Sequence, residues 1–466
     1  MRVQQMGFLL LAVLAPFPAR AAELSPGRVL ERVPCRTPGH SYALYLPSKY
    51  PGQKRWPVIV CFDPGGNGAV PVRLFRDAAE ERGWIVVGSN NSRNGPFEPN
   101  IKAAQIIWDE LGGMAVDERR VYTAGFSGGA QMALLPAASP DCRLAGVLAC
   151  SNKLPDGISP AQLHRGTVYF TVVGIHDFNY WPVMDLSDQL RAYGLISEHA
   201  TFAGPHAWPP ADLLRQALEW FDVQASRNLA RPRDEELAKR VRERSQAGIR
   251  QLEKEGLLAD ALEAWERLSL AWRGMGEVPE AEARIRALRD SPPLRKAQNA
   301  RAARRRREME GLDRLVRQWA RLWRAEDNAL PQSQRIAALG IRSLRRSAAK
   351  KKGTAEGDSA QRLLGHLLAQ AQGRGYDALG AGRWDDAVFC FAVAAEILPG
   401  HPLALYNLAC ANCRAGERHK ALQYLQQAVD AGFRDLDLLS SDEDLKTLRG
   451  DPAFVRLVER LRAGAE

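Results

Sequence analysis

A change of hydrophobic period near residue 230 constrains the fold of this 466-residue chain more than any other feature. Residues 23–225 alternate short runs rich in Val, Ile, Tyr and Phe with amphipathic stretches of helical period. Such alternation predicts a mostly parallel sheet with helices on both faces. From about residue 230 the strand signals disappear and Ala, Leu, Arg and Glu dominate at a period of 3.6, which predicts an all-helical second part.

Eight segments of the first part are predicted to be strands, because β-branched and aromatic residues dominate them. They are Val29–Val33, Ser41–Leu46, Pro57–Phe62, Trp84–Gly88, Arg120–Ala124, Gly146–Cys150, Thr167–Val173 and Glu198–Phe202. The first two are expected to form an antiparallel pair. Helices are expected near residues 71–82, 100–113, 128–137, 183–193 and 209–224. The fold class predicted is therefore α/β, with an eight-stranded, mostly parallel sheet and no large lid domain.

The N-terminus is typical of a secretory signal peptide. Arg2 supplies a positive start, Phe8–Ala15 is an apolar run too short to span a bilayer, and Ala19-Arg20-Ala21 offers a small-x-small cleavage site. We expect residues 1–22 to be removed and the protein to be exported, to the periplasm or the medium; an uncleaved N-terminal anchor is the alternative. No later run is long and apolar enough to predict a membrane span.

Composition excludes several classes of protein. With 45% hydrophobic and 25% charged residues, the chain is globular rather than disordered, and 39 Gly, 28 Pro and 7 Cys exclude collagen-like and small disulfide-rich proteins. Cys410-x-x-Cys413 resembles a redox motif, but it lies in a helical pattern with no strand before it, which favours helix packing. No Cys/His cluster has metal-ligand spacing, so no metal and no cofactor is expected.

A repeat with a spacing of 34 residues marks the helical part. Gly382, Ala387, Phe391 and Ala394 correspond to Gly416, Ala421, Leu425 and Ala428, and a fainter copy is Gly256, Ala261 and Trp265. Glycine would end one helix, alanine would allow two helices to approach closely, and the large residue would fill the core. The spacing resembles the tetratricopeptide repeat, which implies a surface for a protein partner. A generic helical bundle is the alternative.

Residues 291–352 hold 18 Lys and Arg against 5 Asp and Glu, a net charge of +13 in a chain whose total is +10. Leu312, Leu315, Val316, Trp319, Leu322 and Trp323 make one apolar face at helical spacing. We therefore interpret the arginines as the solvated side of amphipathic helices, with contact to an acidic partner or an anionic envelope surface as the alternative. Nucleic acid is not expected to be the partner, because no aromatic platform accompanies the charge.

The sharpest chemical signal is Gly125-Phe126-Ser127-Gly128-Gly129, which follows a predicted strand and precedes a small-residue helix. This is G-x-S-x-G in the strand–turn–helix context in which the serine is a nucleophile. The flanking positions need small residues because neighbouring backbones nearly touch at so sharp a turn. A turn packed with small residues for structural reasons is the alternative.

A serine hydroxyl needs a base, and in this arrangement an acid and then a histidine follow later strands. Asp177 comes just after Thr167–Val173, and His206 comes just after Glu198–Phe202. We therefore predict a triad of Ser127, Asp177 and His206. Competing acids are Asp185 and Asp188, which fall inside a helical pattern, and the competing base is His176, which precedes the expected last strand.

An oxyanion needs two donors, which are usually backbone amides. The amide of Gly128, directly after the nucleophile, is the first. The second is expected in the loop Asp63-Pro64-Gly65-Gly66-Asn67-Gly68; Pro64 has no N–H, so Gly65 is preferred and Gly66 is second. An ordinary strand-to-loop exit is the alternative, and no Lys-Ser/Thr follows that would make this a phosphate loop.

These motifs resemble the α/β-hydrolases, in particular their polyhydroxybutyrate-depolymerase and feruloyl-esterase-like branch. The residues that carry the resemblance are DPGGNG at 63–68, GFSGG at 125–129, Asp177 and G-x-H-x-W-P at 204–209, which includes Trp208. The resemblance covers about residues 27–225 and implies acyl transfer on a small-molecule or polymeric ester. The chain departs from that family at Asp63-Pro64, where His-Gly is usual. Asn90, Asn91 and Arg93 should lie near the rim of the site, as substrate-binding residues or as structural turn-formers. Trp208 is predicted to be a further substrate-binding residue.

The sequence thus predicts a signal peptide (1–22), an α/β-hydrolase domain (23–225), one or more tetratricopeptide-like hairpins (226–290), a basic helical or linker segment (291–360) and further tetratricopeptide-like repeats (361–466). The predicted function is an exported serine hydrolase, most simply a carboxylic-ester hydrolase. A serine peptidase on the same fold and a non-catalytic interaction protein with a degenerate hydrolase domain are the alternatives.

Overall fold

The computed structural model describes residues 25–52, 54–276, 278–326 and 329–463, so the predicted signal peptide lies outside the described residues. The chain forms two compact units, one ending at Ala303 and one beginning at Arg304. The boundary falls inside a long helix, α9 (Pro292–Leu322).

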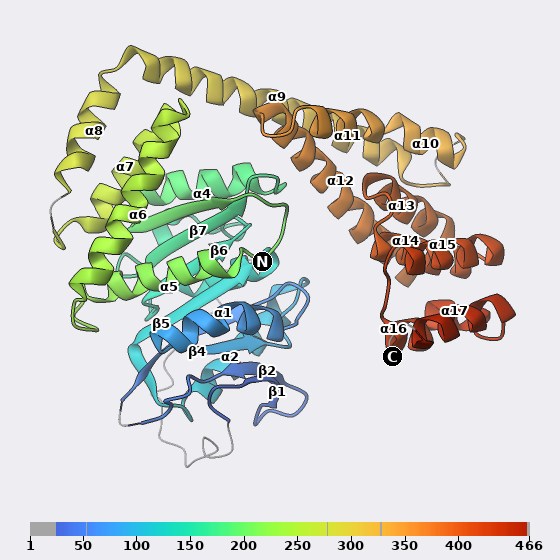
Figure 1. Ribbon diagram of the computed structural model, residues 1–466, viewed down its shortest axis with the longest axis horizontal. Coiled ribbons are helices and arrows are strands. Elements are labelled where there is room, and N and C mark those ends of the chain that lie inside the picture. The colour runs from blue at the N-terminus through green and yellow to red at the C-terminus, as the bar shows by residue number, and fades with distance from the viewer. Residues whose placement is uncertain (1–24, 53, 277, 327–328, 464–466) are drawn as a thin grey trace. The chain divides into compact units, whose positions relative to one another are not determined.

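The first unit is built on an eight-stranded sheet (Figure 1). Its strands are β1 (Val29–Pro34), β2 (Ser41–Tyr45), β3 (Trp56–Phe62), β4 (Ile85–Ser89), β5 (Val116–Phe126), β6 (Gly146–Cys150), β7 (Val168–Gly174) and β8 (Ser197–Phe202). They lie in the order β1-β2-β4-β3-β5-β6-β7-β8, with β2 antiparallel to both of its neighbours and β3 to β8 parallel. This is the strand order of the α/β-hydrolase fold, and the predicted fold class is confirmed.

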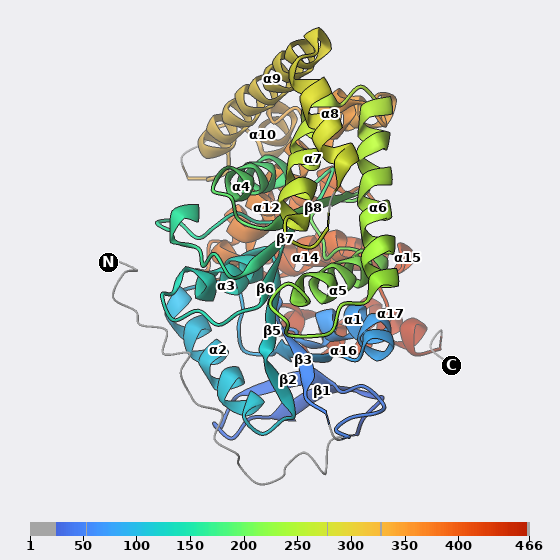
Figure 2. The same ribbon diagram turned by 90° about the vertical axis from the view of Figure 1, so that its left-hand side faces the viewer.

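Helices cover both faces of the sheet (Figure 2). On one face lie α1 (Ala69–Arg82) and α5 (Ala211–Ala225), and on the other lie α2 (Phe97–Leu111), α3 (Gly128–Leu134) and α4 (Tyr180–Ala192). Every residue of β3, β4, β6 and β7 is buried, as expected for parallel strands enclosed on both sides.

The helices that follow α5 pack on the same core as the sheet. These are α6 (Glu235–Lys254), α7 (Leu258–Trp272), α8 (Pro279–Arg289) and the start of α9. Leu237, Trp265 and Leu294 belong to one continuous apolar cluster with Phe75 of α1 and Phe221 of α5. The hairpin predicted at 226–290 is therefore part of the compact unit that holds the sheet.

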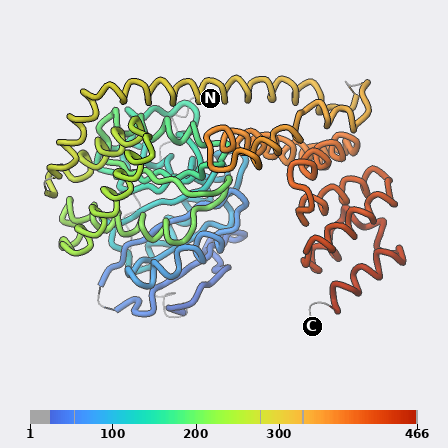
Figure 3. Tube along the Cα trace, turned by 45° about the horizontal axis from the view of Figure 1, so that its top comes forward, coloured from blue at the N-terminus to red at the C-terminus, as the bar shows by residue number. Residues whose placement is uncertain are grey.

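The second unit is helical. Beyond α9 it contains α10 (Gln332–Ala338), α11 (Ile341–Lys350), α12 (Ala355–Gly380), α13 (Trp384–Ile397), α14 (Pro402–Arg414), α15 (Arg418–Asp430), α16 (Leu436–Ser441) and α17 (Pro452–Ala463). Figure 3 follows α12 to α15 as successive helices joined by tight turns. The described part of the basic segment is therefore mostly helical, and Leu315, Trp319 and Leu322 are buried in this unit's core.

The positions of the 34-residue repeat have matching structures. Gly256, Gly382 and Gly416 all adopt a left-handed backbone, with φ of 74°, 73° and 80°, in the turn between paired helices. The alanines five residues later, at 261, 387 and 421, are all fully buried. The large residues nine positions after each glycine (Trp265, Phe391 and Leu425) are buried as well. Each copy is thus a helical hairpin closed by the same turn.

All seven cysteines are described, buried and unpaired. Cys410 and Cys413 lie in α14, where their thiols contact Asp442 and Thr447 of the segment after α16. Burial raises the pKa of both thiols, which opposes the thiolate that redox chemistry needs. Within the part of the chain that the structure describes, no helix is long and apolar enough to cross a membrane.

Candidate active site

Ser127 occupies a sharp turn between β5 and α3. Its backbone has φ 54° and ψ −125°, a strained conformation that sets the side chain above the end of the sheet. The turn depends on two glycines. A Cβ on Gly125 would lie 2.0 Å from the carbonyl oxygen of Gly129, and a Cβ on Gly129 would lie 2.0 Å from that of Phe62. The small residues of G-x-S-x-G are therefore required by backbone contact.

Three predicted residues from separate segments meet at this turn. Nε2 of His206 lies 2.9 Å from Oγ of Ser127, and Nδ1 lies 2.9 and 3.0 Å from the two carboxylate oxygens of Asp177. Asp177 is completely buried, whereas the His206 side chain is 20% exposed. With Nδ1 donating to the carboxylate, Nε2 is left to accept the serine proton.

Two asparagines that sequence reasoning missed brace this arrangement. Asn152 donates from Nδ2 to the carbonyl of Ser127 at 2.9 Å, which holds the strained turn. The backbone amide of Asn179 donates to Asp177 at 2.7 Å, and its side chain donates to the carbonyl of Ser151 at 2.8 Å. Both lie just after strand ends, but Asn is common in such loops, so nothing in the sequence separates them from turn-formers.

The imidazole of His206 lies between two aromatic rings. Phe126 precedes the serine and has its ring centroid 4.6 Å from that of the imidazole; Phe178 follows the aspartate and lies at 4.2 Å. These rings limit the rotation of the histidine and shield its contact with Asp177 from water. Phe126 and Phe178, which adjoin Ser127 and Asp177 in the sequence, therefore position the side chain of His206.

The competing acids and base lie in other settings. Asp185 and Asp188 are in α4, where Asp188 faces Arg301 at 3.3 Å. The amide of His176 donates to the carbonyl of Gly204, within the loop that carries His206.

The loop after β3 is held by the carboxylate of Asp63. Its Oδ1 accepts the amide of Gly65 at 2.9 Å and that of Asn67 at 3.3 Å. Its Oδ2 accepts the indole N–H of Trp208 at 2.9 Å. The amide of Gly66 donates to the Asp63 carbonyl at 3.1 Å. Both glycine amides predicted as oxyanion donors are therefore used within this loop.

The predicted substrate-binding residues divide into two groups. Asn90 bonds Gly68, Glu31 and Ser41, and Asn91 bonds Ser41 and Gly39, so both side chains hold loops together as the structural alternative expects. Arg93 is exposed, with its side chain 3.5 Å from the position a Cβ on Gly66 would take. The ring centroid of Trp208 lies 5.8 Å from that of Phe126, whose ring also contacts the imidazole of His206.

No family model matches this chain, and no curated protein matches it. Among solved structures, the fluorophosphonate-binding serine hydrolase FphF of Staphylococcus aureus is 14% identical, with a TM-score of 0.36, over 42% of this chain and 98% of that one. A ferulic acid esterase is 16% identical, with a TM-score of 0.36, over 42% and 96% of the two chains. Est1E from Butyrivibrio proteoclasticus is 13% identical, with a TM-score of 0.34, over 42% and 98%.

Proposed function

We propose that this chain is a serine hydrolase that cleaves carboxylic esters, with Ser127 as nucleophile, His206 as general base and Asp177 as the residue that orients the imidazole. The observation that carries the proposal is the unbroken line of hydrogen bonds from Asp177 through His206 to Oγ of Ser127, with 2.9 Å on each side of the ring. The strained turn at Ser127 supports it, because such strain is retained where the fold presents a nucleophile.

Each proton in the reaction passes through Nε2 of His206. Oγ of Ser127 attacks the ester carbonyl carbon and gives its proton to Nε2, while the carbonyl electrons move to oxygen. The tetrahedral intermediate expels the alcohol, which takes that proton. Water then attacks the acyl-enzyme, again giving a proton to Nε2, and the acid leaves as Ser127 regains its proton. The buried carboxylate of Asp177 stabilises the imidazolium formed in both steps.

Matched ester and amide substrates test this reaction. We expect hydrolysis of short-chain p-nitrophenyl esters, and activity near background for the corresponding p-nitroanilides. Ser127→Ala should reduce the ester rate by about 10⁴-fold or more, whereas Ser343→Ala, at an exposed helical serine, should leave it unchanged. Preference for the anilides would favour the peptidase alternative, and no activity on either substrate by folded protein would oppose an acyl-transfer function.

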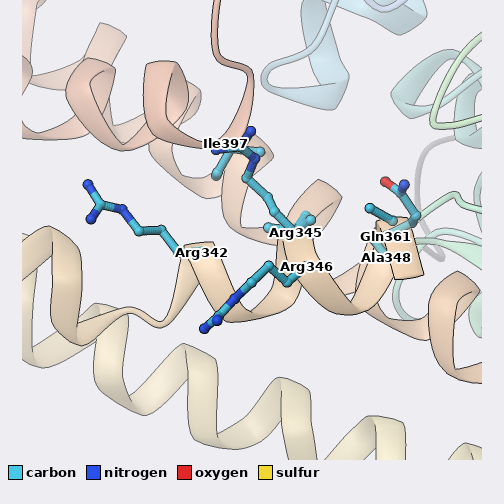
Figure 4. Close-up of a pocket in the computed structure, with 8 residues that line it drawn as sticks. Arg342, Arg345, Arg346, Ala348, Gln361 and Ile397 are labelled. Carbon is cyan, nitrogen blue, oxygen red and sulfur yellow. The ribbon is translucent and has the colours of Figure 1, made fainter. Parts of the chain in front are cut away.

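A second function, the binding of an acidic peptide segment of a partner protein, is favoured by a cavity in the helical unit. Arg342, Arg345 and Arg346 of α11 line this space of about 790 Å³, with Leu364 and Ile397 as its apolar part (Figure 4). Arg342 and Arg345 reach the side chain and the carbonyl of Glu396, and Arg346 is exposed. Guanidinium groups pair well with carboxylates. The apolar lining suits a peptide better than a nucleic acid, which needs stacking platforms.

Fluorescence anisotropy with a labelled Asp/Glu-rich peptide tests this binding. The full chain should bind it, more weakly as salt rises, and Arg342→Glu with Arg346→Glu should weaken binding at least tenfold. The matched control is Arg456→Glu with Arg462→Glu, which makes the same charge change at exposed positions of α17. An equal loss of affinity in both double variants would show that net charge alone drives binding. No binding by the wild type would reject this function for the cavity.

A further inference from the structure

An oxyanion needs two hydrogen-bond donors, and the amide of Gly128 is the one clear donor at this site. Gly128 is the first residue of α3, where helical geometry provides no acceptor for its amide, so its N–H is free to point at a substrate oxygen. The amides of Gly65 and Gly66 already donate to Asp63. The carboxylate of Asp63 holds the Gly65 amide firmly, because it is almost fully buried and also accepts bonds from Asn67 and Trp208, while the backbone carbonyl of Asp63 accepts the Gly66 amide.

Asn94 lies directly beside Gly128. A Cβ built on Gly128 would meet Oδ1 of Asn94 at 2.1 Å and its Cγ at 3.2 Å. The absence of a side chain at position 128 therefore leaves room for the Asn94 amide, next to the N–H that follows the nucleophile. This gives the fourth residue of GFSGG a reason to be glycine that differs from the reason for Gly125 and Gly129, which avoid backbone atoms.

Asn94 also joins the two segments that border the site. Its backbone amide donates to the carbonyl of Pro64 at 2.8 Å, so the residue is tied to the loop after β3 while its side chain touches the start of α3. The side chain is exposed, and within the described residues its carboxamide group makes no hydrogen bond. An asparagine amide carries an acceptor and two donors, and rotation about its last bond exchanges them.

We propose that Nδ2 of Asn94 is the second oxyanion donor, in place of a backbone amide of the glycine loop. This inference rests on the proposed ester hydrolysis at Ser127. As Oγ attacks, the carbonyl electrons move to oxygen, and that oxygen accepts hydrogen bonds from the Gly128 amide and from Asn94; when the leaving group departs, the electrons return to the carbonyl. Asp63 acts as a positioning residue, because it sets the loop whose Pro64 carbonyl holds Asn94.

Substitution of Asn94 tests the donor. We expect Asn94→Ala to lower kcat for a p-nitrophenyl ester by about 100-fold, the usual loss for one oxyanion donor, with KM little changed. Asn94→Asp keeps the shape but offers only acceptors when ionised, so the loss should be at least as large. Inhibition by a trifluoromethyl ketone, whose adduct with Ser127 carries an oxyanion, should weaken by a similar factor. Asn228→Ala, at an exposed loop position of the same unit, should match the wild type.

The outcomes separate this inference from the proposed function. An active wild type whose Asn94→Ala variant keeps kcat within twofold overturns the role of Asn94 and leaves the triad intact. If the wild type neither hydrolyses esters nor reacts with a fluorophosphonate at Ser127, the proposed function fails first. Thermal unfolding of each variant separates lost chemistry from lost folding. Since Asn94 is exposed, the melting temperatures of its variants should stay near that of the wild type. A lower kcat that accompanies a large fall in melting temperature would oppose the donor role.

Discussion

Asp177 has no exposed surface, and both of its carboxylate oxygens face the same nitrogen of His206. Replacing this charge with an amide should keep the shape of the site but remove the stabilisation of the imidazolium and favour the wrong tautomer. We expect Asp177→Asn to lower kcat by about 10³–10⁴-fold. Steady-state kinetics on an ester measures this, and Asp185→Asn in α4 is the matched control, expected to stay near wild type. A larger loss in Asp185→Asn would move the acid to α4.

Single residues were predictable where a motif gives both type and position. Ser127, Asp177 and His206 follow strand ends in a fixed order, and the structure brings all three side chains together. Asp63 and Asn94 were not identified, because their roles depend on contacts between loops far apart in the chain. Gly65 differs, because its amide donates to a residue only two positions away, Asp63, and the sequence does not show that the folded loop turns this carboxylate toward it.

The turn between β5 and α3 is the element on which the site depends. In Gly129→Ala the new methyl would lie 2.0 Å from the backbone oxygen of Phe62, so β3 or α3 has to move. We expect the free energy of unfolding to fall by about 3 kcal/mol, since overpacking against backbone cannot relax by rotation of a side chain. Gly248→Ala in α6, where a Cβ meets nothing within 4 Å, should instead stabilise the unit by about 0.5–1 kcal/mol. Urea unfolding of the two variants measures both effects, and equal changes would contradict this account of the turn.

The contact between α4 and α7 is predicted to depend on pH. Burial and, after it, the negative charge of Glu263 raise the pKa of Asp188 to about 6, although the charges of Arg301 and Arg267 oppose this rise. Since the folded chain then binds this proton more tightly than the unfolded chain does, the contribution of Asp188 to stability falls as pH rises from about 4 to about 6 and is constant above that.

Asp188→Asn removes this proton uptake. The melting temperature of the variant minus that of the wild type should therefore increase as pH rises from 4 to 7, whatever the difference is at pH 4. Thermal scans at intervals across that range test the slope. A difference that stays constant with pH would show that Asp188 is ionised throughout.

Strand existence was predicted more reliably than strand extent. All eight strands lie where the sequence places them, but β5 begins at Val116 rather than Arg120. The extra residues include Asp117, Glu118 and Arg119, whose polarity hides the strand from a hydrophobic pattern. In the fold, Asp117 pairs with Arg120 at 2.8 Å, which lets this polar end extend beyond the buried part of the sheet.

At the scale of the whole molecule, the compact units do not follow the change of period. The sequence switches to helices near residue 230, yet α6 and α7 share a core with the sheet, and the first unit extends to Ala303. Periodicity reports the type of an element but not the surface on which its apolar face packs, so this boundary was beyond sequence reasoning. The 34-residue spacing did predict hairpins closed by left-handed glycines.

Two tryptophans test the assignment of cores to units. Trp265 of α7 is fully buried in the first unit, and its indole N–H donates to Glu253 at 2.7 Å. Trp265→Ala should cost the first unit about 3–5 kcal/mol and lower the temperature at which esterase activity is lost. Trp319→Ala removes a buried ring from the second unit and should leave that temperature near wild type. The reverse order of effects would contradict the division at residue 303.

The measurement that tests the central claim most directly is fluorophosphonate labelling of the full chain beside its Ser127→Ala variant, with the modified peptide identified by mass spectrometry. The reagent needs an activated serine but no knowledge of the natural ester. The hydrogen-bonded line through His206 predicts one labelled peptide, containing Ser127, and no labelling of the variant. Absence of label in folded wild-type protein, or label that persists in the variant, would contradict the assignment of Ser127 as the nucleophile.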